Sequence, residues 1–272
     1  MGLKNTKVLP NFEGIPGANQ TGTATLRLPI GSTYHQVLVS YGNLTPAQMT
    51  ELRIVANGKA IQRFTSGTQL DTIMKYEGRA SATADNILIV DFDRFGLRTR
   101  AAEELTSLGT GDPNDQAKIT TLALEIDITA GVSVPTLSAK AIQSAPRPSG
   151  IIRDIRNFSY TAAGSGTFEI SDLPRGPLVN KILFLSSAIT KLEVKRDNFT
   201  VFERLVAENN RVQSDGVRVP QTGVFVYDTT EDGNGADALA TEQVNDLRFI
   251  LTLSAPGAIP VVVEYLNRIQ SV

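Results

Sequence analysis

Few side chains in this sequence could do chemistry. His35 is the sole histidine among 272 residues and cysteine is absent, so thiolate chemistry, a disulfide and a multi-histidine metal site are excluded. A serine or threonine nucleophile would need His35 as its base, and the sequence has no G-x-S-x-G elbow. A lone histidine in a β-branched segment is typical of a strand residue. We expect no catalytic residue and no bound cofactor.

Carboxylates offer a second kind of chemistry, the binding of a cation. The segment DFDR would place two aspartates on one face of a strand, and DTTEDGNGAD superficially resembles a calcium loop. The second segment is not an EF-hand, because Thr230 occupies the third position and Leu239 stands where the bidentate glutamate belongs. Solvated strand ends and turns are the alternative interpretation. The candidate ligands for a structural divalent cation such as calcium are Asp91, Asp93, Asp228 and Asp232.

Composition excludes several classes of protein. The net charge is -2, from 26 basic and 28 acidic residues without a long block of either, so direct nucleic-acid binding is not expected. Tryptophan is absent and aromatic residues make up 6%, which argues against a sugar-stacking platform. No apolar run approaches the roughly 18–20 residues that cross a bilayer. Hydrophobic residues at 41% are sufficient for a folded core.

Short β-branched segments separated by turns predict an all-β fold. In TTLALEIDI the leucines and isoleucines alternate with polar or small residues, which is typical of a strand with one buried face. Residues 51–64 predict a hairpin with a type I′ turn at Asn57-Gly58. Helical spacing occurs in TQLDTIMKY and TRAAEELTSL, which we expect to be short helices packed on the sheets.

The two halves of the chain share an order of segments. Leu28-Pro29-x-Gly31 returns as Leu173-Pro174-x-Gly176, and Asp197-Asn198 stands where Asn57-Gly58 stood. A second helical patch, FTVFERLVAEN, follows in the place of TQLDTIMKY. From residue 122 onward the halves align with a constant offset of 125 that also pairs Pro135 with Pro260. A duplication explains this order better than chance does.

Eight short strands per copy with long connections predict two tandem eight-stranded jelly-roll barrels with a few short helices in loops. An immunoglobulin-like pair is the structural alternative, but its cysteine and tryptophan core is impossible here. The Pro- and Ser-rich segment QSAPRPSG reads as a linker. We predict an N-terminal arm over residues 1–20, a first jelly roll over 21–145, and the linker with the second jelly roll over 146–272.

Several segments together resemble a known family. LPIGSTY, LTPAQMTELRIVANGK, FEISDLPRG and the closing LRFILTL…VVVEYL are similar to the major capsid protein of corticoviruses, which are icosahedral bacteriophages with an internal membrane. The resemblance extends from about Leu26 to Leu266. It places the chain in the double jelly-roll lineage of tectivirus and adenovirus coat proteins. The longer arm and the loop TEDGNGADALATEQ depart from the family pattern.

The resemblance implies a major capsid protein that forms homotrimers, in which six barrels make a pseudo-hexagonal capsomer of the shell. Its expected partners are copies of itself and other virion proteins, including membrane-associated and vertex proteins. The expected location is the virion capsid, assembled in the host cell cytoplasm. Two alternatives remain: a minor virion protein of a vertex or spike, and a double jelly-roll carbohydrate-active or carbohydrate-binding protein. Arg147, Arg153 and Arg156, around the linker, are expected to pair with a neighbouring barrel.

Overall fold

The computed structural model describes residues 3–112, 114 and 118–269. The first two residues of the expected arm and the last three of the expected second jelly roll lie outside this range. The described chain forms two compact units. The first contains the chain up to Lys75, Arg79–Ile155 and the chain from Asn267, and the second contains Tyr76–Gly78 and Arg156–Leu266. The boundary between residues 145 and 146 stays a prediction.

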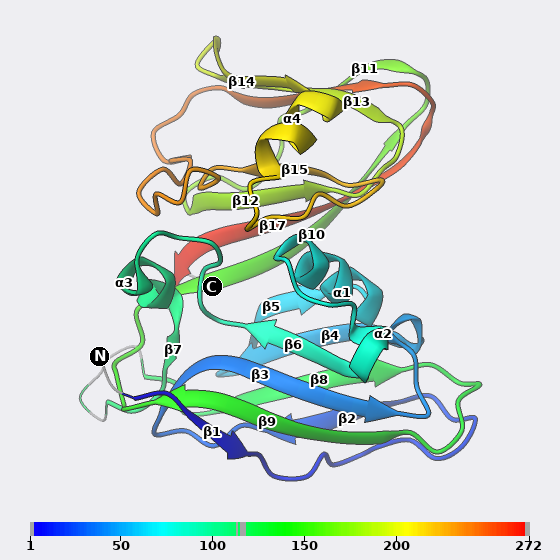
Figure 1. Cartoon of the computed structure of the whole chain (residues 1–272), viewed down its shortest axis with the longest axis vertical. Coiled ribbons are helices and arrows are strands. Elements are labelled where there is room, and N and C mark those ends of the chain that lie inside the picture. Colours follow the sequence, from blue (N-terminus) through cyan, green and yellow to red (C-terminus); the bar gives the residue numbers. More distant parts are fainter. Residues whose placement is uncertain (1–2, 113, 115–117, 270–272) are drawn as a thin grey trace. The chain divides into compact units, whose positions relative to one another are not determined.

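The first unit is a sandwich of two sheets. Its strands are β1 (Asn5–Val8), β2 (Gly22–Arg27), β3 (Thr33–Gly42), β4 (Met49–Ala56), β5 (Lys59–Phe64), β6 (Ile87–Asp91), β7 (Leu108–Gly109), β8 (Leu122–Ile128) and β9 (Thr136–Ser144). One sheet has the order β1-β9-β3-β6 with β7 also on β3, and β5-β4-β8-β2 lie together in the other (Figure 1). Part of the predicted arm is thus a strand, β1, at a sheet edge.

Short helices lie in the connections of this unit. They are η1 (Pro46–Gln48), α1 (Gly67–Tyr76), α2 (Ala82–Asp85), α3 (Arg100–Glu103) and η2 (Glu104–Thr106). The predicted helix in TQLDTIMKY is α1, and TRAAEELTSL contains α3 and η2. Among the described residues, no helix is long and apolar enough to cross a membrane.

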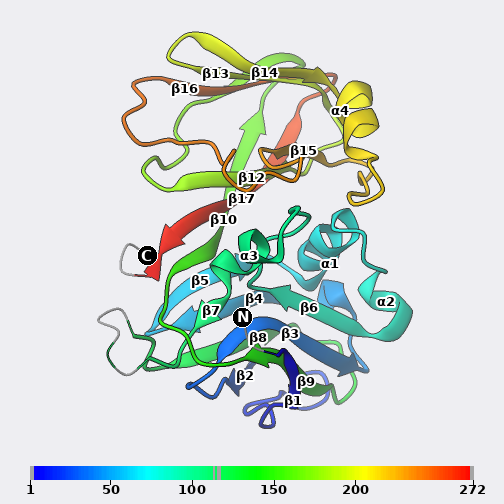
Figure 2. The same ribbon diagram turned by 60° about the vertical axis from the view of Figure 1, so that its left-hand side comes forward.

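The second unit repeats this sandwich. Its elements are β10 (Ile151–Ala162, shared with the first unit), β11 (Gly166–Ile170), β12 (Leu178–Phe184), β13 (Ile189–Arg196), β14 (Phe199–Leu205), α4 (Val206–Gln213), β15 (Phe225–Asp228), β16 (Leu247–Leu253) and β17 (Gly257–Arg268). One sheet has the order β11-β16-β13-β14, and β15-β12-β17-β10 are neighbours in the other (Figure 2). All-β architecture with two jelly rolls is therefore confirmed.

Alternation of side chains builds the cores as predicted. β8 has every second residue buried, beginning with Leu122, and β16 has the same pattern beginning with Leu247. The core of the second unit contains Phe184, Leu192 and Phe249, which are each at most 1% exposed. Burial of such side chains contributes about 1.5–3 kcal/mol each, so the two cores supply the main stabilisation of the fold.

Matching irregularities show that the units are repeats. In the β4–β5 hairpin the register shifts after Ile54, and in the β13–β14 hairpin it shifts after Val194. Both turns use two residues with positive φ, Asn57-Gly58 and Asp197-Asn198, as a type I′ turn requires. β-bulges are specific features that related structures tend to conserve. Their recurrence at equivalent positions of the two hairpins therefore supports the predicted duplication.

The Leu-Pro-x-Gly corners have the same structure in both units. Gly31 has φ 105° and Gly176 has φ 115°, values that favour glycine. The amide of Gly31 donates to Thr110 Oγ1 at 3.0 Å, and the amide of Gly176 donates to Thr241 Oγ1 at 2.9 Å. Each corner carries the chain from one sheet to the other, from β2 to β3 and from β11 to β12.

Two sequence predictions were wrong. FTVFERLVAEN is not a helix throughout: Phe199–Leu205 is strand β14 and only the following residues form α4, because pairing with β13 overrides the helical spacing. Pro135 and Pro260 are not equivalent either. Val39 and Phe184 occupy equivalent positions of β3 and β12. Val39 pairs with Ala139 and Phe184 pairs with Val261, so the last strands of the two repeats align with an offset of 122 residues. The loop before β17 is shorter than the loop before β9, so the offset of 125 ends at β16.

Candidate functional site

The sole histidine lies in a bulge of β3. Pairing of β3 with β9 skips between Tyr34 and Gln36, so His35 is the extra residue, and its side chain is 1% exposed. His35 Nδ1 lies 2.9 Å from Asp93 Oδ2, and Nε2 lies 2.9 Å from Ser144 Oγ. Bulges re-aim side chains and often occur beside functional sites. The bulge therefore makes His35 the centre of a buried polar cluster.

Lys4, just before β1, connects the arm to this cluster. Its Nζ lies 3.0 Å from Asp93 Oδ2 and 3.0 Å from Glu104 Oε1. Burial alone would lower the pKa of Lys4, but the hydrogen bonds to Glu104 and Asp93 outweigh it and raise this pKa. Likewise burial would raise the pKa of Glu104, yet bonds from Arg100 and Lys4 hold it below its ordinary value. At neutral pH the lysine is therefore a cation between two carboxylates.

Ser144, His35 and Asp93 form a hydrogen-bonded chain of the kind used in serine hydrolases. Its surroundings do not suit that chemistry. His35 is closed off from solvent, and the Asp93 carboxylate is shared with Lys4, which lowers its capacity to support a protonated imidazole. The arrangement instead holds β3, β9 and the arm together. His35 lies in a strand, as its sequence context predicts, whereas its partners Asp93 and Ser144 were not predicted from the sequence.

The same cluster is the one place where the described residues could gather three metal ligands. One ligand atom each from His35, Asp93 and Glu104 lies within 4.8 Å of the others. Of the predicted cation ligands, only Asp93 belongs to this group. Lys4 Nζ already supplies the compensating positive charge, so the geometry does not require an ion.

Asp91 and Asp228 are equivalent residues that bind arginines. Asp91 ends β6 opposite Gln36, and Asp228 ends β15 opposite Lys181. Arg79 Nη2 lies 2.9 Å from an Asp91 carboxylate oxygen, and Arg218 Nε lies 2.7 Å from Asp228 Oδ2. Arg79 lies in the connection from α1 to β6, and Arg218 lies in the connection from α4 to β15. The same kind of ion pair thus occurs at the last residue of both strands.

The Asp228 pair is fully buried in the second unit. The side chains of Asp228 and Arg218 are each 1% exposed, and Tyr76 Oη donates to Asp228 Oδ2 at 3.2 Å. Burial would raise the pKa of Asp228, but the positive charges of Lys181 and Arg218 outweigh it and hold this pKa below its ordinary range. With its oxygens engaged by Arg218, Tyr76 and Thr230, Asp228 has a structural role.

Asp232 and the linker arginines have local partners. Asp232 Oδ1 accepts from the amide of Asn234 at 2.8 Å, an Asx turn in an exposed loop. Arg147 Nη2 donates to the carbonyl of Glu104, Arg153 Nη1 donates to the carbonyl of Asp93, and Arg156 lies over the ring of Tyr265. These contacts are within the chain, so pairing with a neighbouring barrel stays a prediction.

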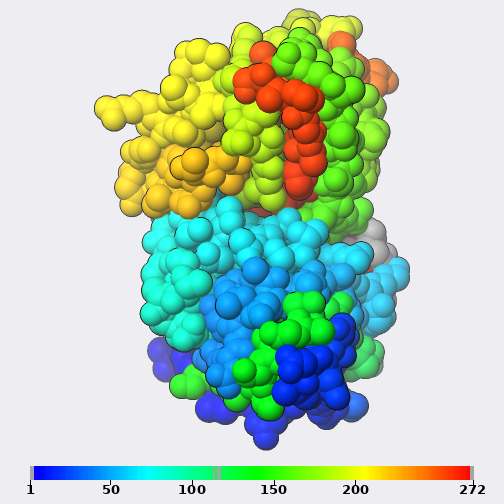
Figure 3. Space-filling view, turned by 90° about the vertical axis from the view of Figure 1, so that its right-hand side faces the viewer, coloured from blue at the N-terminus to red at the C-terminus, as the bar shows by residue number. Residues whose placement is uncertain are grey.

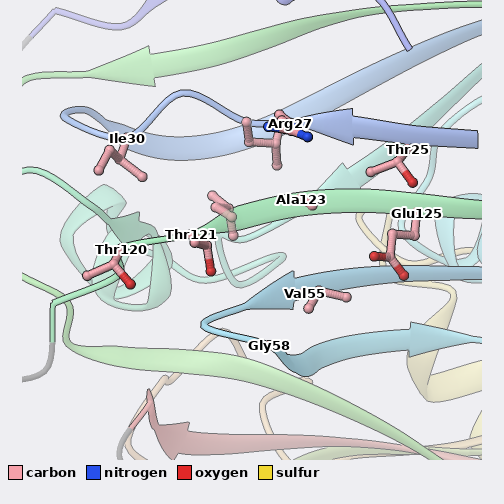
Figure 4. A pocket seen from close by; sticks show the side chains of 11 residues that line it. Thr25, Arg27, Ile30, Val55, Gly58, Thr120, Thr121, Ala123 and Glu125 are labelled. Carbon is pink, nitrogen blue, oxygen red and sulfur yellow. The ribbon is translucent and has the colours of Figure 1, made fainter. Parts of the chain in front are cut away.

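An open hollow of about 440 Å³ lies over β2, β8 and the β4–β5 turn (Figure 4). Thr25, Thr121 and Ile30 are among its lining side chains. Glu125, which also lines it, accepts a hydrogen bond from Arg53 Nε at 2.6 Å. The one carboxylate that lines the hollow is therefore already engaged by an arginine.

Family models match both halves of the chain. Residues 6–144 match the viral coat protein P2 N-terminal domain, and residues 152–269 match the viral coat protein P2 C-terminal domain. The chain belongs to the viral coat protein P2 family. Membership of this family gives it a structural role, in agreement with the absence of catalysis expected from the sequence.

Individual relatives of this P2-family protein cover nearly its full length. The major capsid protein P2 of Pseudoalteromonas phage PM2 is 23% identical over 265 residues, spanning 94% of this chain and 96% of the relative. The crystal structure of P2 from bacteriophage PM2 superposes with a TM-score of 0.87 at 21% identity, covering 98% of both chains. The predicted resemblance to this group is confirmed.

More distant capsid proteins share the fold. The STIV MCP, from Sulfolobus Turreted Icosahedral Virus, has a TM-score of 0.69 at 11% identity over 97% of each chain. PBCV-1 VP54 has a TM-score of 0.65 at 10% identity, covering 97% of this chain and 93% of that protein. At these identities the likeness establishes the double jelly-roll fold.

Proposed function

We propose that this protein is the major capsid protein of an icosahedral bacteriophage with an internal membrane. The observation that carries the proposal is the match to the major capsid protein P2 of phage PM2, which covers 94% of this chain and extends through both jelly rolls. A vertex or spike protein would share one or both folds but be present in few copies. Copy number per virion therefore separates the alternatives.

The proposed assembly unit is a homotrimer whose six jelly rolls form a pseudo-hexagonal capsomer. The duplication supports it, because two barrels with matching corners, hairpins and ion pairs let three chains present six similar sides. A contact between two different surfaces of the same chain forms a closed ring when the rotation between neighbouring copies adds up to a full turn. Three chains can thus form a pseudo-hexagonal ring, and such rings can tile a hexagonal lattice from one gene product.

The charge distribution agrees with a shell that does not bind the genome directly. Lys4, one of two lysines in the arm, is engaged by Asp93 and Glu104. The expected partners are further copies of the chain, membrane-associated proteins beneath the shell and vertex proteins. We place the protein in the virion capsid, assembled in the host cell cytoplasm, with a divalent cation such as calcium as a candidate component of the lattice.

The mass of the purified protein in solution tests the proposal. Light scattering should give about 88 kDa, three times the chain mass of 29.3 kDa, at micromolar concentration. Negative-stain images should show hexagonal particles. A monomer at all concentrations, or only a few copies per purified virion, would contradict the major capsid role.

A further inference from the structure

Each repeat begins with a strand that pairs with the last strand of the same repeat. β1 precedes β2 and pairs antiparallel with β9, from Asn5↔Gln143 to Val8↔Lys140. β10 precedes β11 and is the neighbour of β17. Because β9 and β17 are equivalent, β1 and β10 are equivalent as well. The arm strand is therefore the opening strand of the first repeat.

The second edge of these opening strands is used differently. β10 pairs in parallel with β5 through Ile155↔Gln62, a contact that lies within the first unit. β1 ends its sheet, and in the described part of the chain it pairs with β9 alone. All four of its residues are exposed, and Figure 3 shows this dark-blue segment on the surface. The opening strand of the second repeat, β10, thus pairs on both of its edges, whereas the opening strand of the first repeat, β1, has one open edge.

β14 is the equivalent of β5 and also has an open edge. The matching bulges place Phe202 at the position of Gln62 and Val201 at the position of Ile61. Ile61 is 1% exposed, whereas Val201 is 49% exposed. Phe199 and Leu205, the first and last residues of the same strand, are 76% and 48% exposed. β14 lacks the cover that its counterpart has.

We propose that β14 of one copy pairs in parallel with β1 of a second copy. The inference rests on the proposed trimer and names the contact that closes it: the β5–β10 pairing made once inside each chain is repeated between chains by β14 and β1. Exposed apolar strand edges invite pairing with another chain unless they are covered. Lys7 is the one charged residue of β1, and the charged residues of β14, Glu203 and Arg204, are already paired within the chain with Lys191 and Glu231, so like charges do not oppose the pairing.

Disulfide trapping tests this contact, and the absence of native cysteine makes it specific. Neighbouring strands bring Cα atoms within the span that a disulfide accepts. One chain carries Val201→Cys, and a second, isotope-labelled chain carries Thr6→Cys, Lys7→Cys or Val8→Cys. After mixing, assembly and oxidation, mass spectrometry should find a cross-linked pair of one labelled and one unlabelled chain. Val134→Cys, at a valine outside both strands that is 59% exposed, is the control for cross-links formed by random collision.

A second variant needs no cross-link. Val201→Lys should lower the trimer fraction at least tenfold at a fixed concentration while leaving the urea midpoint of the monomer unchanged, because Val201 is exposed in the single chain. Val134→Lys should leave both unchanged. Trimers that form without a β1–β14 cross-link and tolerate Val201→Lys would overturn this inference and leave the proposed function standing. Absence of any trimer would overturn both.

Discussion

Asp228→Asn is the substitution with the sharpest expected consequence in a single chain. It keeps the shape of the side chain and its acceptor toward Thr230, but removes the charge that faces Arg218. Arg218 then becomes a buried cation whose remaining carboxylate partner is Asp215, at 3.0 Å. The second jelly roll should lose stability while the first is unchanged.

The expected loss of free energy of unfolding follows from the burial of the ion pair. Removing one partner of a buried ion pair costs about 3–5 kcal/mol, because the other charge stays desolvated. Both side chains here are 1% exposed, so solvent screening is small. With a urea slope of about 2 kcal/mol/M for a unit of this size, the midpoint should fall by about 1.5–2.5 M.

The pH dependence has a definite sign. The pKa of Asp228 is lower in the folded chain than the ordinary value of about 3.9, so its contribution to the free energy of unfolding is complete above that value. It is lost as the pH falls through the folded pKa. The difference between wild type and Asp228→Asn should therefore be constant from about pH 7 to 5 and shrink below about pH 4.

The appropriate assay is urea unfolding monitored by amide hydrogen exchange, because exchange reports the stability of each unit separately. Asp232→Asn is the matched control, because asparagine preserves the exposed Asx turn, and its midpoint should not move. A loss below about 1 kcal/mol in Asp228→Asn would refute the reasoning about the buried pair. Calcium that raises the wild-type midpoint, but not that of the variant, would instead make Asp228 a cation ligand.

Three further predictions concern the first unit. Lys4→Met should speed amide exchange of β1 and lower the free energy of unfolding by about 1 kcal/mol, because it leaves two carboxylates without their shared cation. Lys7→Met should do neither, and hydrogen-exchange mass spectrometry of both variants tests the difference. Gly31→Ala should cost about 1–3 kcal/mol in urea unfolding, because its φ is 105°, and Gly150→Ala, in open space, should change stability by less than about 0.5 kcal/mol. Arg79→Met should cost about 1–2 kcal/mol, less than Asp228→Asn, since Arg79 is 28% exposed; equal losses would contradict the dependence on burial.

Local sequence patterns predicted most of the elements correctly. Asn57-Gly58 needs positive φ at both turn positions, and alternation in residues 122–128 needs one buried face, so short-range chemistry was sufficient for both. Phe199–Leu205 was not predictable in this way. Its spacing suits either a helix or a strand, and the adjacent β13 decided in favour of a strand.

The candidate site depended on contacts far apart in the sequence. Lys4, His35 and Asp93 are ordinary residues of three separate segments, and their spacing carries no motif. A register shift of one residue in β3 turns His35 toward Asp93 and Ser144. Such a shift follows from pairing with β9, which no local pattern specifies.

The sequence by itself determined that the chain is a duplicated all-β protein, because periodicity and turn residues act locally. Tertiary structure decided how each charged side chain is used. The aspartates proposed as cation ligands proved to have separate partners: Asp91 and Asp228 bind arginines, Asp93 binds His35 and Lys4, and Asp232 caps a turn. Charge compensation depends on distance and burial in three dimensions, and these arise only when the strands have paired.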